Sequence, residues 1–196
     1  MFTLEEGEEL VRIARENIET YLSSGRRINL KDVKEKYRKK MGVFVTLNKD
    51  GELRGCIGYP RPVLPLIDAL LDVSISAAVR DPRFPPVTLK EMEKITVEIT
   101  ILTPPELIKC KPKDYPKNIK IGRDGLIVEK GFFSGLLLPQ VAVEWNWNEE
   151  EFLSNTCLKA GLPMDAWLDP DTRVYRFQGQ IFYEDSGKVK EKSFKA

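Results

Sequence analysis

The stretch VFVTLNKDGELRGCI occupies residues 43–57 and decides the fold class. Before it, apolar residues recur at helical spacing; within it, the pattern becomes that of extended chain. Asp50-Gly51 in its middle supplies the positive φ angle that a tight hairpin turn needs. The stretch therefore predicts antiparallel strands at 43–47 and 52–57.

Two helices are predicted before this hairpin. Thr3 and Glu6 form a capping box for an amphipathic helix that stops at Gly25. Asn29 is the expected N-cap of a second, shorter helix that ends at Gly42.

The next elements after the hairpin are a helix, a short capped helix and a strand. Residues 65–79 repeat apolar side chains at intervals of three and four, which predicts a buried helix. Small residues at 76–78 would let another backbone approach it closely. Thr88 with Glu91 caps a short helix, and the alternation over 95–101 predicts a half-buried strand.

The rest of the chain adds strands and one more helix. The segment 104–122 is rich in Pro and Lys, and we expect it to be an excursion or a lobe junction. The remaining expected elements are a strand at 126–128, an extended segment at 136–145 with Pro139 at an edge or bulge, a helix from the N-cap Asn148 to Ala160, and a strand pair or one long strand at 174–184. Antiparallel strands with flanking helices and no βαβ alternation define the α+β class. We expect a single domain over 1–196, made of two unequal lobes with a cleft between them.

The composition excludes whole classes of chemistry. The 196 residues include no histidine, so Ser-His-Asp and Cys-His catalysis and all His-containing metal sites are impossible on this chain alone. The 31 basic and 30 acidic residues give a net charge of +1, which disfavours nucleic acid as a partner. The bias toward Glu and Lys resembles the surface ion-pair networks of thermophilic proteins.

A basic run at 34–40 has two interpretations. It could bind nucleic acid, or it could be the solvated face of the second predicted helix. Glu35 and Tyr37 interrupt the run, and this favours the solvated face.

Cysteine usage and the N-terminus predict the compartment. Cys56, Cys110 and Cys157 are odd in number, far apart and form no CxxC pair, which indicates a reducing cytoplasm rather than a disulfide framework. The first ten residues are acidic where a signal peptide would be basic, and no apolar run approaches the roughly 18 residues that span a bilayer. We expect a soluble cytoplasmic protein that does not contact a membrane.

The first candidate site is LRGCIG at 53–58. Gly55 and Gly58 allow close backbone approach around Cys56, and Arg54 points to the same strand face as Cys56. A guanidinium beside a thiol favours the thiolate, so Cys56 is a candidate nucleophile. The alternative is a buried cysteine that packs as a small hydrophobe between structural glycines.

The second candidate site is RDPRFPP at 80–86. Its prolines make a stiff loop, and Arg80, Asp81 and Arg83 could hold a carboxylate or phosphate. The alternative is an internal ion pair of Asp81 with Arg80 or Arg83. In a third, mainly apolar segment, Gln140 is a weak polar handle. We expect no metal and no cofactor, because the sequence has no EF-hand, P-loop or dinucleotide pattern.

Four segments together are similar to the AMMECR domain family: LRGCIG at 53–58, SAAVRDPRFPP at 76–86, GLLLPQVA at 135–142 and CLKAGLP at 157–163. The resemblance spans nearly the whole chain. It implies a two-lobed α+β domain with antiparallel sheets and no established biochemical activity. Some members of the family are fused to, or encoded beside, Memo-like proteins and a radical-SAM protein, so the resemblance also implies partners of those kinds.

Two functional hypotheses result. In the first, the protein is an enzyme or small-molecule binder in which Cys56 reacts without histidine, Arg54 favours its thiolate, and Arg80 or Arg83 holds an anionic group. In the second, the protein is a non-catalytic interaction module. RNA binding is disfavoured by the near-zero charge. Either way, we expect the two motifs on one wall of a cleft, because a helix over 65–79, at about 1.5 Å per residue, can run back alongside the preceding strand.

Overall fold

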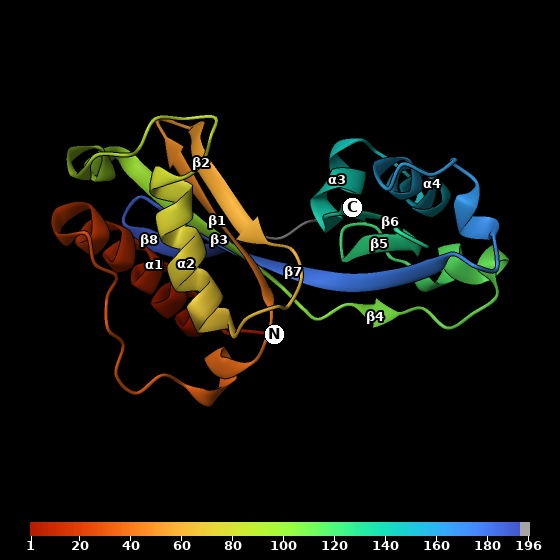
Figure 1. Ribbon diagram of the computed structural model, residues 1–196, viewed down its shortest axis with the longest axis horizontal. Coiled ribbons are helices and arrows are strands. Elements are labelled where there is room, and N and C mark those ends of the chain that lie inside the picture. Colours follow the sequence, from red (N-terminus) through yellow and green to blue (C-terminus); the bar gives the residue numbers. More distant parts are fainter. Residues whose placement is uncertain (193–196) are drawn as a thin grey trace. The chain divides into compact units, whose positions relative to one another are not determined.

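The computed structural model describes residues 1–192 and shows antiparallel strands with flanking helices, which confirms the α+β class (Figure 1). The described chain divides into two compact units. Unit 1 contains residues 1–104 and 180–192, and unit 2 contains residues 105–179. The arrangement of two unequal lobes around a cleft stays a prediction.

Unit 1 is built on the predicted hairpin. β1 (Gly42–Lys49) pairs antiparallel with β2 (Glu52–Tyr59), around a turn in which Asp50 and Gly51 have φ angles of 53° and 82°. β1 also pairs along its whole length with β3 (Ile95–Leu102), and β3 neighbours β7. The strand order of the described chain therefore begins β2-β1-β3-β7, and β2 is an edge strand.

Two predicted helices pack on one face of the unit 1 sheet. α1 (Leu4–Ser24) begins at its capping box and ends before Gly25, whose φ is 70°. α2 (Leu66–Val79) lies beside it, as Figure 1 shows. Both helices share a core with the inward-facing residues of β1, which are Val43, Val45 and Leu47. Full burial of each such side chain stabilises the fold by roughly 1.5–3 kcal/mol.

The close approach expected near the C-terminal end of α2 is present. A Cβ on Gly55 of β2 would lie only 2.1 Å from the carbonyl oxygen of Ala77 in α2. The absence of a side chain at this position lets the strand lie directly on the helix backbone. The contact of Gly55 with Ala77 therefore fixes the distance between β2 and α2 at the residue next to Cys56.

The helix predicted after Asn29 is wrong, because only a short 3-10 helix, η1 (Glu35–Arg38), forms before β1. Contacts with α1 explain the difference. Oδ1 of Asn17 accepts a hydrogen bond from the N–H of Ile28, and the hydroxyl of Tyr37 donates to a glutamate of α1. These tertiary bonds hold the segment along α1 and override its local helix propensity.

The end of the chain supplies the last strands of unit 1. β7 (Arg173–Asp185) is one long strand, which was one of the two interpretations of this region. Residues 180–185 of β7 belong to unit 1. β8 (Lys188–Lys192), which the sequence did not predict, pairs antiparallel with them around a turn at Gly187.

Unit 2 consists of antiparallel strands with flanking helices. β5 (Asp124–Lys130) pairs with β6 (Phe133–Leu137) and with the first part of β7, and the short β4 (Glu106–Leu107) also pairs with β7. α4 (Glu149–Lys159) starts at its predicted N-cap Asn148 and packs on β5 and β6. The core of the unit includes Leu126, Val128, Phe152, Leu153, Trp167 and Val174.

The extended segment expected at 136–145 is wrong in its second half. β6 ends at Leu137, and Pro139 begins α3 (Pro139–Glu144) instead of marking a strand edge. Proline suits the first position of a helix, because its φ angle is already helical and the N–H it lacks would have no partner there.

The segment 104–122 lies almost entirely in unit 2. It contains β4 and the 3-10 helix η3 (Pro112–Asn118), and another 3-10 helix, η4 (Ala166–Leu168), follows later in the unit. The segment also contributes Ile108, Tyr115 and Ile119 to the core of unit 2. Its role as a lobe junction stays a prediction.

Candidate functional site

The side chain of Cys56 points away from the helices of unit 1. Successive residues of a strand face opposite sides, and Gly55 and Ile57 face α2 and the core. Cys56 is half-buried, and its Sγ lies 3.2 Å from Oγ1 of Thr46, which is opposite it on β1. The thiol therefore lies beside a hydroxyl group on the outer face of the sheet, and not in the core of unit 1.

The backbone of Cys56 is bound by the RDPRFPP segment at the free edge of β2. Its N–H donates to Oδ2 of Asp81 at 2.9 Å, and its C=O accepts from Nη2 of Arg83 at 3.3 Å. Arg83 also donates through Nε and Nη2 to the two oxygens of Asp81, at 3.0 and 2.7 Å. Asp81 thus pairs with Arg83, and the pair binds the edge as a neighbouring strand would.

Asp81 is a buried and fully compensated charge. Its side chain is 2% exposed and also accepts a hydrogen bond from the N–H of Arg83. The Arg83 guanidinium, helped by the N–H groups of Cys56 and Arg83, holds the pKa of Asp81 well below its ordinary value against the opposing effect of burial. Asp81 is therefore ionised at neutral pH, and Arg83 keeps a fixed geometry.

Arg83 is coupled electrostatically to Cys56. The pKa of Arg83 is raised mainly by its hydrogen bonds to Asp81, and the negative charge of a Cys56 thiolate adds to this in the same direction. The Arg83 side chain is 54% exposed. An anion that approaches from solvent can therefore reach a guanidinium that is already oriented.

Arg54 has other partners. Its guanidinium donates to both carboxylate oxygens of Glu91, at 3.2 and 3.3 Å, and to the carbonyl oxygen of Pro85 at 2.9 Å. These bonds tie β2 to the end of the RDPRFPP segment. That Arg54 activates the thiol stays a prediction.

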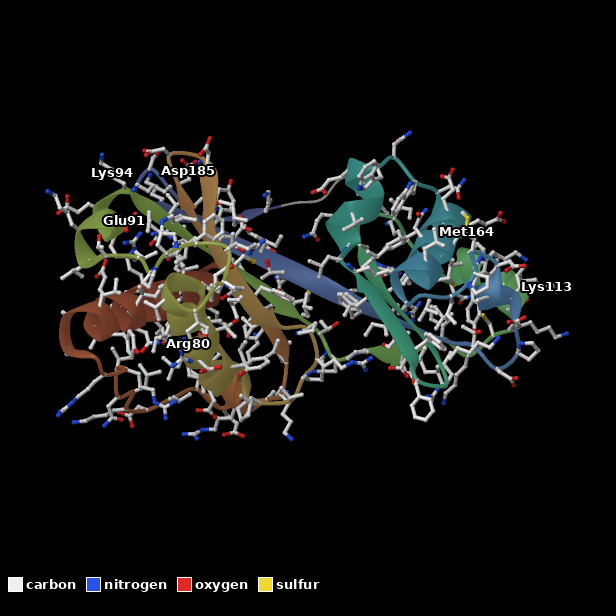
Figure 2. All side chains as sticks on the ribbon, turned by 45° about the horizontal axis from the view of Figure 1, so that its top comes forward. Arg80, Glu91, Lys94, Lys113, Met164 and Asp185 are labelled. Carbon is white, nitrogen blue, oxygen red and sulfur yellow. The ribbon has the colours of Figure 1, made fainter. Side chains whose placement is uncertain are left out.

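Glu91 is the charged centre of a second cluster. It is labelled in Figure 2 and lies in the 3-10 helix η2 (Leu89–Lys94). Its capping box with Thr88 is present as predicted. Its carboxylate accepts hydrogen bonds from Lys49, Thr88 and Arg54, which lower its pKa to about 2. Because the donors Lys49 and Arg54 come from β1 and β2, the cluster holds η2 against both strands of the hairpin.

Arg80 and Gly58 are close in sequence to the first cluster, in which Asp81 and Arg83 bind the backbone of Cys56. Arg80, labelled in Figure 2, is the C-cap of α2. Its Nη1 lies 3.6 Å from Oδ1 of Asp72 and 3.3 Å from Oγ of Ser76. Gly58 lies under the ring of Phe44, where a Cβ would be 2.3 Å from the ring. Arg80 is 58% exposed and so remains accessible to an anion.

The remaining predicted site residue, Gln140, is in the first turn of α3 in unit 2. Its part in a site stays a prediction. Cys110 and Cys157 are also in unit 2, where burial raises the pKa of both thiols, that of Cys157 to about 11. Within residues 1–192, no group of three or more Cys, Asp or Glu side chains could hold a metal ion.

Thr46 and Glu91 were not predicted as parts of a site. Regular pairing around the Asp50-Gly51 turn would put Val45 opposite Cys56, but a register shift between Leu47 and Asn48 brings Thr46 there instead. No local pattern indicates that shift. Glu91 carried only its capping signal. Its contact with Arg54 spans 37 residues, and no local pattern indicates it.

The fold and these clusters define a class of protein: an α+β domain in which a cysteine on an edge strand is tied to a proline-rich loop. The chain belongs to the AMMECR1 family, whose family model matches residues 11–182. This confirms the resemblance found in the four sequence segments.

The chain is similar to archaeal proteins over almost its whole length. It is 59% identical over 194 residues to protein PF1979 of Pyrococcus furiosus, which covers 95% of this chain and 92% of that protein. It is 57% identical over 197 residues to protein MJ0810 of Methanocaldococcus jannaschii, which covers 98% of each. The crystal structure of the uncharacterized protein PH0010 from Pyrococcus horikoshii matches with a TM-score of 0.83 and 56% identity, over 96% of this chain and 97% of that one.

No helix among residues 1–192 combines the length and the apolar character needed to cross a membrane.

Proposed function

We propose that the outer face of β2 around Cys56 is a binding site for a small anionic molecule, and that any catalysis there uses the Cys56 thiol. The observation that carries the proposal is the position of Arg83. Its guanidinium is fixed by Asp81, bound to the backbone of Cys56 and still half exposed. A preorganised cation bound to the backbone of a residue that carries a half-buried thiol suits an anionic ligand with a reactive group.

The other residues of the proposed site have supporting roles. Asp81 positions Arg83, and Arg80 offers a second exposed guanidinium. Gly55 and Gly58 keep the strand close to α2 and to Phe44. We further assign Arg54 to the thiol-activating role that the sequence predicts.

The chemistry has to proceed without histidine. A cysteine reacts as its thiolate, and the chain has no imidazole to take the thiol proton. The Thr46 hydroxyl can bond to sulfur but is not a base, so the proton goes to solvent. The reaction rate then follows the fraction of the thiol that is present as thiolate.

Alkylation of Cys56 by iodoacetamide, followed over pH by peptide mass spectrometry, tests the proposal. We expect Cys56 to react in the folded protein, and Arg83→Gln to slow the reaction at neutral pH. The same measurement on Arg54→Gln shows whether Arg54 or Arg83 has the larger effect on the alkylation rate of Cys56. Circular dichroism checks that each variant is folded. A Cys56 that is unreactive in the folded protein, or that reacts equally in all three proteins, would refute the proposal.

A ligand screen provides the second test. Phosphate, pyrophosphate and small dicarboxylates are added to the wild type, to Arg83→Gln and to a matched control, Arg123→Gln, while the unfolding temperature is measured. Like Arg83, Arg123 pairs with a buried aspartate close to it in sequence, Asp124, but it lies in unit 2. An anion that stabilises the wild type and the control, and not Arg83→Gln, supports the site.

A second candidate function is a non-catalytic interaction module in the cytoplasm. The observation that favours it is internal pairing: Asp81 binds Arg83, and Glu91 binds Arg54. Such pairs hold the two motifs together whether or not a ligand binds. The family resemblance supplies Memo-like and radical-SAM proteins as partners. Calorimetric titration with a purified Memo-like protein tests this, and binding that survives Cys56→Ser would separate the two candidates.

A further inference from the structure

The segment at 26–40 concentrates positive charge. It holds eight of the 31 basic residues of the chain and two of its 30 acidic residues, a local charge of +6 in a chain of net charge +1. All other residues together therefore carry −5. Such a charge asymmetry indicates a surface for an anionic partner.

The structure removes the main alternative explanation for this run. The segment is not the solvated face of a helix, because only the short η1 forms within it. Two of its lysines are satisfied by α1: Lys34 pairs with Glu9 and Lys36 with Glu6. These pairs hold the segment in place.

The other basic side chains point to solvent. Arg38 has only a 3.8 Å contact with a highly exposed glutamate. Five more are exposed and, within residues 1–192, form no ion pair: Arg26, Arg27, Lys31, Lys39 and Lys40. Six cations thus lie on a segment whose backbone tertiary contacts already order, so binding a partner costs no ordering of the backbone that carries them.

The surroundings favour an acidic protein segment over a nucleic acid. Glu5 and Glu8 line the same pocket as Lys34, so a phosphate backbone with one charge per roughly 1.7 Å would meet carboxylates there. The only aromatic residue of the segment, Tyr37, is 1% exposed and cannot stack on a base. A peptide can place separate carboxylates on the cations alone.

A pocket beside the segment also suits a peptide. It has a volume of about 310 Å³ and lies between the segment and α2. Charged and apolar residues line it, among them Arg27, Asp68, Leu30 and Leu71. A side chain of a bound peptide can insert there next to Arg27, whereas Asp68 would repel a phosphate.

We propose that residues 26–40 form a docking surface for an acidic stretch of a partner protein, separate from the Cys56 site. Carboxylates of the partner bind Arg26, Arg27 and Lys31 at one end of the surface. At the other end they bind Arg38, Lys39 and Lys40.

Fluorescence anisotropy tests this with a fluorescein-labelled synthetic peptide in which Glu and Asp residues flank a single Leu. The test variant is Arg26→Glu/Arg27→Glu/Lys31→Glu. The control is Lys109→Glu/Lys111→Glu/Lys113→Glu in unit 2, where all three lysines are exposed and form no ion pair within the described chain. Lys113 is labelled in Figure 2. Both variants change the net charge equally, and circular dichroism checks their folding.

We expect the wild type and the control to bind the peptide alike, and the test variant to bind it about tenfold more weakly, with all affinities falling as salt rises. A peptide with Gln and Asn in place of the acidic residues should not bind. Three results would overturn the proposal: no binding at low salt, equal losses in both variants, or tighter binding of a labelled DNA duplex that only the test variant loses.

Discussion

The N–H of Cys56 donates a hydrogen bond to Oδ2 of Asp81 at 2.9 Å, and this contact joins two segments that are 25 residues apart. The same carboxylate holds the Arg83 guanidinium, which returns to the carbonyl group of Cys56. LRGCIG and RDPRFPP are thus two halves of one hydrogen-bonded cluster. Any change in the loop therefore also changes the strand that carries the thiol.

Asp81→Asn tests the importance of this cluster for stability. The substitution keeps the size of the side chain but removes its charge and turns one acceptor into a donor that faces N–H groups. We expect the free energy of unfolding to fall by about 2 kcal/mol, measured by urea denaturation. The control is Asp185→Asn, which removes an exposed carboxylate paired with Lys190 and should leave stability unchanged. Equal effects would contradict the assigned role of Asp81.

Gly55→Ala tests the close contact between strand and helix. The added methyl group would lie 2.1 Å from the carbonyl oxygen of Ala77, so β2 has to move away from α2. We expect a loss of about 3 kcal/mol in the free energy of unfolding. Gly51→Ala has open space but a φ of 82°, so it should cost only about 1 kcal/mol of backbone strain. Similar losses for the two variants would show that the contact with Ala77 is not limiting.

The elements predicted correctly have local signals. Asp50-Gly51 marks the hairpin turn, and Thr3 with Glu6 marks the start of α1, in each case within a few residues. The segment before β1 has no comparable local signal. Its conformation depends on Asn17, which is 11 residues from its partner Ile28, and no periodicity within the segment contains that information.

In the candidate site, too, contacts within one segment could be predicted from the sequence and contacts between distant segments could not. Strand alternation predicted that Arg54 and Cys56 share a face of the strand, but it left open whether Cys56 lies in the core or outside it. The ion pair of Asp81 with Arg83 was one of two open interpretations, because both lie in one loop. The partner of Arg54 was not predictable. Glu91 comes from η2, and only the tertiary fold brings it to the guanidinium.

Glu91→Gln tests the second cluster through pH. The pKa of Glu91 is about 2 in the folded protein and about 4.5 when unperturbed, since Lys49, the N–H of Thr88 and Arg54 all favour its charged form. A lowered pKa contributes stability that is fully present above about pH 4.5 and is lost as pH falls towards 2. The wild type should therefore be more stable than Glu91→Gln at pH 7, and the difference should shrink at pH 3. Urea denaturation at both values measures it, and a constant difference would contradict the coupling.

Cys157 should give the opposite pH dependence in alkali. It is fully buried in the core of unit 2, and burial raises its pKa from about 9 to about 11. The unfolded thiol ionises first, so the stability that Cys157 contributes is complete below pH 9 and declines as pH rises towards 11, at up to about 1.4 kcal/mol per pH unit. Cys157→Ala removes this titration together with some packing. It should therefore be less stable than the wild type at pH 8, and the gap should narrow by pH 10.5. Urea denaturation in the presence of reductant measures both values, and a gap that stays constant would mean that the thiol is not buried in the folded protein.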